Sequence, residues 1–293
     1  MSAHLSRRDA LKTLAGGLAL ASLPRLASAE EKSMNAPASP APSGFRHSVC
    51  KWCYKDIPLA EFAAAVKAFG IESVELLDPK DWPVVQQLGL TCALANGTTT
   101  IPKGFNRIEH HAAYVASMTT RIDQCADAGI PSVIVFSGNR DGMSDEQGLE
   151  NCVVGLKQLV GHAEKRGVNI IMELLNSKVN HKDYMCDRTP WGVELVKRVG
   201  SERFKLLYDI YHMQIMEGDV IRTIQSSHVY IGHYHTAGNP GRAEIDATQE
   251  LNYPAIMRAI KATGFTGFVA QEFIPKRKPA LDSLREAVQL CTV

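Results

Sequence analysis

Short apolar runs alternate with longer amphipathic runs along this chain from Phe45 onward. The short runs have the length of buried strands, whereas the longer runs repeat apolar residues at helical spacing. The pattern predicts eight strands, at residues 46–50, 73–77, 91–95, 132–136, 169–173, 204–209, 229–235 and 267–272. It predicts helices between most of them, including residues 59–69, 107–128, 149–165 and 253–262.

Glycines mark where several predicted helices end. The stretches "AFGIESVEL", "DAGIPSVIVF", "KRGVNIIMEL" and "ATGFTGFVAQE" each place a glycine shortly before the next strand, which is a common C-cap position. Repeated strand–helix alternation predicts a parallel sheet. Eight strands at this length indicate a (β/α)8 TIM barrel, for which we predict a catalytic domain over residues 44–293. A doubly wound open sheet is the alternative, disfavoured because no G-x-G-x-x-G follows the first strand.

Polar side chains occupy the C-terminal ends of the predicted strands, where a barrel of this kind forms its active site. The second and third strands end near Glu75 and Asn96. The last four strands each end in a side chain able to bind a metal ion, and these are Glu173, Asp209, His233 or His235, and Glu272. Because adjacent strands lie about 4.8 Å apart, four neighbours can converge on one ion.

These strand-end residues together predict a metal site. Each alone is more often a helix cap, an ion-pair partner or a packing residue, but burying several carboxylates without a cation is very costly. Three carboxylates and one imidazole suit Mn²⁺ or Mg²⁺ better than a structural zinc site, and Zn²⁺ or Co²⁺ stays compatible. His233 and His235 share one strand face, so spacing alone does not choose between them.

The N-terminal residues differ in kind from the rest. Arg7 and Arg8 precede a short apolar segment, and the small residues 27–29 follow it. This stretch resembles a twin-arginine export signal that is cut after Ala29, so we predict a signal peptide over residues 1–29 and a periplasmic mature protein. A membrane anchor is the alternative, although the segment is short against the ~20 residues of a span. Residues 30–43 are rich in Pro, Ala and Ser and predict a flexible linker.

The charge composition of the chain indicates which class of binding partner to expect. The formal net charge of +1 argues against nucleic acid, because proteins that bind phosphate backbones usually carry a basic excess. A small molecule is therefore the expected partner, and a homo-oligomer is compatible with the sequence. Seven cysteines are scattered without a spacing that proposes disulfide pairs. "CKWC" at residues 50–53 is a lone C-x-x-C, for which small core residues at a strand end are favoured over zinc or redox chemistry.

Several stretches resemble the xylose-isomerase-like TIM barrels, and within them the hydroxypyruvate isomerases and the ketose 3-epimerases. The resemblance covers about residues 45–290 and is most specific in "GIESVELL", "MELLN", "YDIYHMQ", "IGHYHTAGNPGRAEID" and "FVAQEFIP". It implies that one divalent ion is held by Glu173, Asp209, His235 and Glu272. His235 stands where hydroxypyruvate isomerases usually have Gln and 3-epimerases have His. "NSKVNHKDY" lacks the additional glutamate of the 3-epimerases, which counts against a true ketose epimerase.

The resemblance also implies an activity. It indicates an isomerase of the aldose–ketose type that moves a proton next to a carbonyl through an enediolate, with hydroxypyruvate as the leading substrate. Glu173 and Glu272 would be the acid–base pair, and His212 and Arg242 would contact substrate oxygens. Trp52 and Asn96 are expected to contribute to the substrate site, and Trp82 is either a second apolar wall or a core residue.

Four other functions stay open. A ketose 3-epimerase and a keto-sugar or inosose lyase or dehydratase use the same metal and the same enolisation. A nuclease would want several metals and a basic groove, which the near-neutral charge disfavours. A non-catalytic sugar-binding barrel needs no acid–base pair, so the presence of both Glu173 and Glu272 disfavours it.

Overall fold

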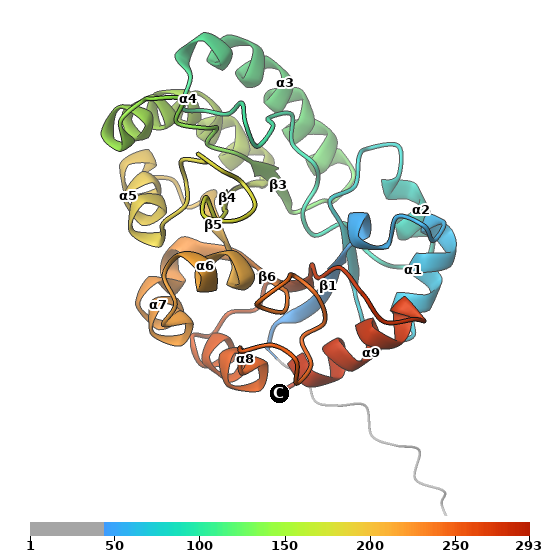
Figure 1. Ribbon diagram of the computed structural model, residues 1–293. Coiled ribbons are helices and arrows are strands. Elements are labelled where there is room, and N and C mark those ends of the chain that lie inside the picture. The colour runs from blue at the N-terminus through green and yellow to red at the C-terminus, as the bar shows by residue number, and fades with distance from the viewer. Residues whose placement is uncertain (1–43) are drawn as a thin grey trace, which may run out of the picture. The chain divides into compact units, whose positions relative to one another are not determined.

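Parallel strands surround the centre of the protein in the computed structural model, which describes residues 44–293 (Figure 1). The predicted export signal and linker lie outside these residues and stay predictions. Within the described range one sheet has the strand order β2-β1-β7-β6-β5-β4-β3. Its strands are β1 (Arg46–Cys50), β2 (Ser73–Glu75), β3 (Ser132–Val135), β4 (Asn169–Leu174), β5 (Phe204–Asp209), β6 (Ile231–Thr236) and β7 (Phe268–Gln271).

The predicted strand at residues 91–95 closes the sheet without forming a regular ladder. Thr91 bridges to Ser73 of β2, and Ala95 bridges to both Leu77 and Val133. The backbone N–H of Ala93 donates to the side-chain hydroxyl of Ser73 at 2.8 Å, which takes the place of a ladder bond and interrupts the strand. The segment therefore fills the eighth position, and the predicted (β/α)8 barrel is confirmed.

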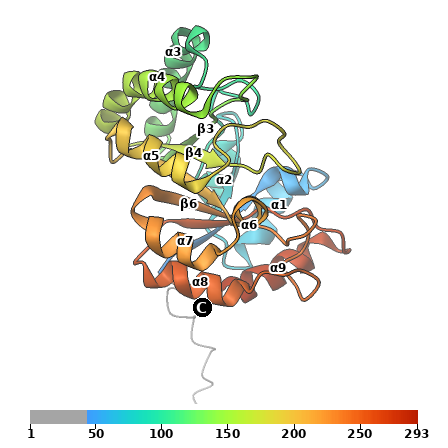
Figure 2. The same cartoon turned by 60° about the vertical axis from the view of Figure 1, so that its left-hand side comes forward.

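Helices ring the strands in both views (Figures 1 and 2). The described α-helices are α1 (Leu59–Lys67), α2 (Trp82–Gln87), α3 (Ile108–Asp127), α4 (Asp145–Arg166), α5 (Thr189–Val199), α6 (Ile210–Met216), α7 (Val220–Ser227), α8 (Tyr253–Ala262) and α9 (Ala280–Cys291). Short 3₁₀ helices are η1 (Lys51–Tyr54) and η2 (His228–Tyr230). Among residues 44–293, none of the helices is long and apolar enough to cross a membrane.

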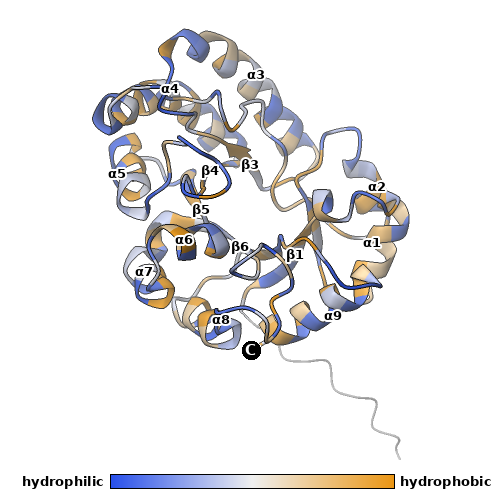
Figure 3. Cartoon of the chain, in the orientation of Figure 1, coloured by the Kyte–Doolittle hydropathy of each residue, from blue (hydrophilic) through white to orange (hydrophobic). Residues whose placement is uncertain are grey.

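Side-chain patterning explains how the helices attach to the sheet. Helix α8 buries Tyr253, Ile256, Met257 and Ile260, which share one face at helical spacing. Figure 3 shows hydrophobic and hydrophilic positions on the same helices, for example on α8 and α9. A helix with one apolar stripe gains free energy by burying that stripe, and here the helices pack their apolar faces toward the strands from outside the barrel.

Local capping sets the bounds of α4, which begins at Asp145, four residues before the start of the predicted helix at residue 149. The Ser144 hydroxyl accepts the N–H of Gln147, and Asp145 and Glu146 occupy the first turn, where acidic groups favour the helix dipole. Gly167 ends the helix in the left-handed conformation with φ of 73°. The prediction from apolar spacing missed the polar first turn because that turn carries no core residue.

Candidate active site

The structure brings together the four residues that were predicted to bind a metal ion. Glu173 lies in β4, Asp209 ends β5, His235 lies in β6, and Glu272 directly follows β7. All four are buried, and one ligand atom from each lies within 4.8 Å of the others. Parallel register explains the meeting, since Asp209 pairs with His235 across β5 and β6.

His235 and Arg242 are the positively charged or chargeable neighbours of these carboxylates. His235 Nδ1 lies 2.9 Å from Glu272 Oε2 and 3.6 Å from Glu173 Oε1. Arg242 Nη2 lies 2.6 Å from Glu272 Oε2 and 3.8 Å from Asp209 Oδ2. The guanidinium and the imidazole both make their shortest contacts with Glu272, so the negative charges of Glu173 and Asp209 are less well compensated.

Two buried carboxylate oxygens test whether a cation fits. Glu173 Oε1 and Asp209 Oδ2 have no hydrogen-bond partner among residues 44–293. An unpaired buried carboxylate oxygen loses its water without replacement, which costs free energy unless a cation or a donor faces it. Three carboxylates and one imidazole form an oxygen-rich set, so these residues fit a hard divalent ion.

The environment separates the pKa values of the two predicted acid–base residues. Burial raises the pKa of Glu173, and the negative charge of Glu272 adds to that rise. Burial also acts to raise the pKa of Glu272, but His235 and then Arg242 outweigh it and hold that pKa well below its usual value. One fold thus gives two neighbouring carboxyl groups opposite proton affinities, the arrangement that acid–base chemistry requires.

His212 lies beside Asp209, as the spacing implied, although it is fully buried. Asp209 caps α6 by accepting the backbone N–H of His212 at 3.0 Å. The His212 Nδ1 accepts the backbone N–H of Asn176 at 3.1 Å, which places the imidazole proton on Nε2 in the neutral ring. This Nε2 has no hydrogen-bond partner among the described residues and lies 3.7 Å from Asp209 Oδ2, so its proton is available to a further acceptor. Its contact with a substrate oxygen stays a prediction.

Trp52 and Arg242 form one side of the site. The indole N–H of Trp52 donates to Glu272 Oε1 at 2.9 Å, and the Arg242 guanidinium lies 5.1 Å from the Trp52 ring centre. Arg242 has a φ of 52°, a left-handed conformation that costs a non-glycine residue free energy and is often found at functional sites. Trp82 is not a wall of this site, because it is 3% exposed and donates to the backbone oxygen of Leu77 within the core.

A pocket of about 470 Å³ opens beside the carboxylates. Its lining includes the charged residues Glu173, Arg242 and Glu272 together with Asn96 and Ile101. The pocket has both polar and apolar surface. The predicted positions of Trp52 and Asn96 next to a substrate are thus geometrically accessible, while their contact with one stays a prediction.

Two residues at the site, His181 and Glu75, received no role from the sequence. His181 lines the pocket and packs against His212 with the rings tilted by 58° and their centres 5.3 Å apart. Glu75 Oε1 lies 2.8 Å from His235 Nε2 and 2.9 Å from His233 Nε2. The strand-end position of Glu75 was visible in the sequence, but only the closed barrel shows that β2 comes this near to β6.

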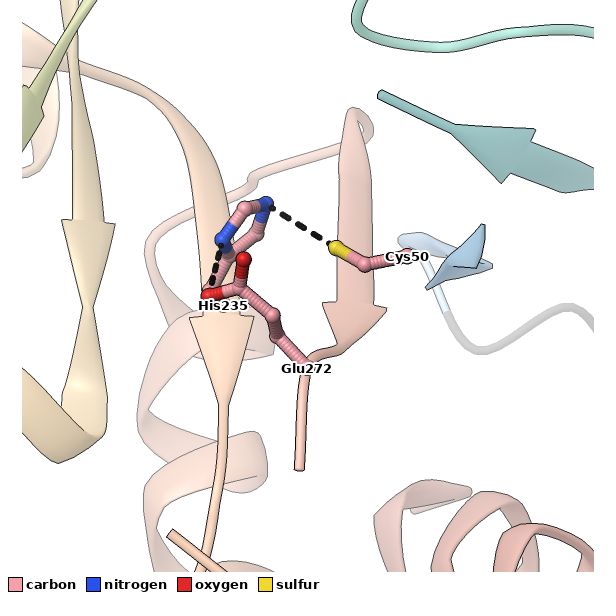
Figure 4. A group of neighbouring side chains, drawn as sticks. All are labelled: Cys50, His235 and Glu272. Atoms are coloured by element: carbon pink, nitrogen blue, oxygen red, sulfur yellow. Dashed lines mark hydrogen bonds and ion pairs between the residues drawn. The ribbon is translucent and has the colours of Figure 1, made fainter. Parts of the chain in front are cut away.

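The cysteines of the C-x-x-C stretch do not act as a pair. All seven cysteines are free thiols. Cys50 Sγ lies 3.8 Å from His235 Nε2, on the opposite side of the ring from Glu272 (Figure 4). Cys53 belongs to none of the candidate metal-ligand groups among residues 44–293. Burial raises the pKa of both thiols, which disfavours the thiolate that zinc binding or redox chemistry needs.

Comparison with known proteins shows relatives along most of the described chain. A putative hydroxypyruvate isomerase from Homo sapiens is 25% identical over 239 residues, which cover 80% of this chain and 81% of that protein. A 2-oxo-tetronate isomerase from Pectobacterium atrosepticum is 26% identical over 244 residues, which cover 77% of this chain and 90% of that protein.

Solved structures share the fold. A family 2 AP endonuclease from Brucella melitensis has a TM-score of 0.73 at 23% identity and covers 82% of this chain and 97% of its own. The 3-keto-D-glucoside 4-epimerase from E. coli has a TM-score of 0.72 at 17% identity and covers 84% of this chain and 98% of its own. Residues 51–291 match the family described as "Xylose isomerase-like TIM barrel", and the protein belongs to this family.

Proposed function

We propose that the protein is a divalent-metal-dependent isomerase that acts on a small α-hydroxy carbonyl compound through an enediolate. The observation that carries the proposal is the pair Glu173 and Glu272, two buried carboxylates that both face Nδ1 of His235 and have opposite pKa shifts. The names of the relatives from Homo sapiens and Pectobacterium atrosepticum, both isomerases, support the same class of reaction.

Glu173, Asp209, His235 and Glu272 would hold the ion, with Mn²⁺ or Mg²⁺ as the favoured metal and Zn²⁺ or Co²⁺ as alternatives. A divalent ion in such a site supplies Lewis-acid polarisation of a substrate carbonyl. Its two positive charges also offset the carboxylates that Arg242 leaves uncompensated.

The side chains would divide the remaining work. One of Glu173 and Glu272 takes the carbon-bound proton next to the carbonyl, and the same or the other carboxylate returns a proton to the neighbouring carbon. His212 donates from Nε2 to the oxygen on which negative charge develops. Arg242 faces the pocket and can bind the carboxylate of a hydroxy-keto acid such as hydroxypyruvate.

Proton exchange tests this proposal. The full chain is freed of metal by chelation, reloaded with Mn²⁺ or Mg²⁺, and incubated in deuterium oxide with hydroxypyruvate or a 2-oxo-tetronate. We expect deuterium in the recovered substrate and product by NMR, and none with the metal-free protein. Equal exchange with and without metal would contradict metal dependence, and binding without any exchange would indicate a sugar-binding barrel.

Pocket size favours a second candidate, an epimerase, lyase or dehydratase that acts on a keto-sugar. A space of about 470 Å³ lies within the range of pockets for drug-sized ligands, and a three-carbon acid fills only a part of it. Ile101→Trp would fill part of the pocket wall, and Ile108→Trp, at an exposed position on α3, is the matched control. Loss of turnover on six-carbon ketoses alone would favour this candidate, whereas equal turnover of three-carbon and six-carbon substrates in both variants would count against it.

We also propose that the twin-arginine route exports the protein to the periplasm. This rests on residues 1–29, with Arg7 and Arg8 as the motif. The route carries folded proteins, so the ion would be bound before export. Arg7→Lys combined with Arg8→Lys should leave the protein in the cytoplasmic fraction, and unchanged periplasmic recovery would contradict the proposal.

A further inference from the structure

Glu75 is a buried carboxylate that the proposed reaction does not use. It ends β2, is 0% exposed and accepts four side-chain hydrogen bonds, the longest from the Cys50 thiol to Oε1 at 3.8 Å. The His235 and His233 Nε2 atoms lie 2.8 Å and 2.9 Å from its Oε1, and the Ser48 hydroxyl donates to its Oε2 at 2.5 Å. The side-chain atoms that contact the Glu75 oxygens are a hydroxyl, a thiol and two imidazole nitrogens, all of which can donate, so Glu75 acts as the acceptor in these contacts.

This acceptor determines which nitrogen of His235 carries a proton. Because Glu75 only accepts, His235 must donate from Nε2. Its Nδ1 faces Glu272, on the other side of the ring from Cys50 (Figure 4). Glu173 Oε1 lies 3.6 Å from the same nitrogen. A metal ligand must present a lone pair, and Nδ1 is the nitrogen that can do so while Nε2–H stays bonded to Glu75.

The same contacts argue against a second ion between Glu75, His233 and His235. These three residues lie close enough to form a ligand group. Yet the Glu75 oxygens and both Nε2 atoms already have partners at hydrogen-bond distance, unlike Glu173 Oε1 and Asp209 Oδ2. An ion there would have to break two buried hydrogen bonds and would satisfy no unpaired atom. An ion at the four-residue site replaces the one contact between His235 Nδ1 and Glu272 Oε2, and it satisfies Glu173 Oε1 and Asp209 Oδ2, which have no hydrogen-bond partner among the described residues.

We propose that Glu75 is a positioning residue that holds His235 with its proton on Nε2 and its Nδ1 lone pair toward the metal site, and that His233 orients Glu75 rather than binding metal. The inference rests on the proposed function, because it assumes that His235 is a ligand. It assigns His233 and His235 different roles, which their shared strand face left undecided.

Glu75→Gln tests the role of the charge at nearly constant volume. The control is Glu72→Gln, the same change at an exposed glutamate three residues earlier. Each full chain is freed of metal and titrated with Mn²⁺ by calorimetry, with metal counted by mass spectrometry. We expect one ion per chain in the wild type and in Glu72→Gln. In Glu75→Gln we expect Kd to rise by about 10–100-fold, the usual effect of losing the partner of a ligating histidine.

A second measurement applies even if Glu75→Gln does not fold. Histidine ¹⁵N NMR of the wild-type full chain loaded with diamagnetic Mg²⁺ reports the protonated nitrogen of each ring. Protonated Nε2 in both His233 and His235 supports the inference. A proton on Nδ1 of His235 overturns it.

The outcomes separate the inference from the proposed function. A wild-type chain that binds no Mn²⁺ overturns the proposed metal site itself. Tight binding in the wild type together with equal Kd in folded Glu75→Gln and Glu72→Gln overturns only the role of Glu75. Two ions per chain in the wild type and one in Glu75→Gln would instead make Glu75 a ligand, and would also overturn the inference.

Discussion

Replacing Glu173 and Glu272 by Gln, one at a time, should impair turnover in both variants but change the stability of the metal-free protein differently. Glu272 receives Arg242 at 2.6 Å, His235 at 2.9 Å and Trp52 at 2.9 Å. Removing one partner of a buried ion pair costs about 3–5 kcal/mol, because the other charge stays buried and unpaired. For a chain of this size that is a fall in Tm on the order of 10 °C.

In the metal-free protein the Glu173 carboxylate, unlike that of Glu272, lacks contacts that offset the cost of its burial. Its Oε1 has no hydrogen-bond partner among the described residues, and burial raises its pKa, so its carboxylate is unfavourable without metal. A neutral amide of the same shape removes that cost, and we expect Glu173→Gln to match or exceed the wild type in the free energy of unfolding. Turnover of the metal-loaded variants should fall about 10²–10⁴-fold in both cases, because neither amide accepts a proton.

Thermal unfolding in a chelator, followed by circular dichroism, measures the first effect, and turnover with saturating Mn²⁺ measures the second. Deuterium wash-in adds a further distinction. The variant without the first base should lose exchange of the carbon-bound proton, whereas the other variant can keep exchange without forming product. A metal-free Glu173→Gln that is as unstable as Glu272→Gln would refute the electrostatic reasoning. Near-normal turnover in either variant with metal retained would refute the two-carboxylate mechanism.

Three further predictions follow from other parts of the structure. His235→Gln should retain more metal than His235→Ala, because Gln offers one ligand oxygen, and equal loss in equilibrium dialysis would point away from His235 as the ligand. Burial lowers the pKa of His47 to about 4 from its usual 6.5, so the unfolded chain takes up the proton first as pH falls. The stability that neutral His47 contributes is complete above about pH 6.5 and is lost by about pH 4, a change of roughly 3 kcal/mol that should shrink in His47→Gln when urea unfolding is compared at both pH values. Gly97→Ala would place a Cβ 1.9 Å from the backbone oxygen of Ile134 and should lower stability by about 1–3 kcal/mol, whereas Gly161→Ala in α4 meets nothing within 4 Å and should raise Tm slightly.

Much of the fold could be predicted from the sequence because it depends on local periodicity. Alternation of buried strands with one-sided helices is visible residue by residue, and glycines mark several helix ends. The failure at residues 91–95 shows the limit of such patterns. Their apolar content is that of a strand, but the bond from Ala93 to the Ser73 hydroxyl belongs to a contact between segments distant in the sequence.

For the site too, local sequence predicts some features and only the tertiary structure decides the others. Glu173, Asp209 and Glu272 could be predicted because each ends an apolar strand, and strand ends of a parallel barrel meet on one face. Register and barrel closure decided what the sequence left open. They place His235 within hydrogen-bond distance of Glu272. They also bring Glu75 at the end of β2 within hydrogen-bond distance of both β6 histidines, His233 and His235. A strand pattern states which face a side chain occupies, but only the packing of strands far apart in the chain determines which groups share a buried volume and therefore exchange protons, charges or a metal ion.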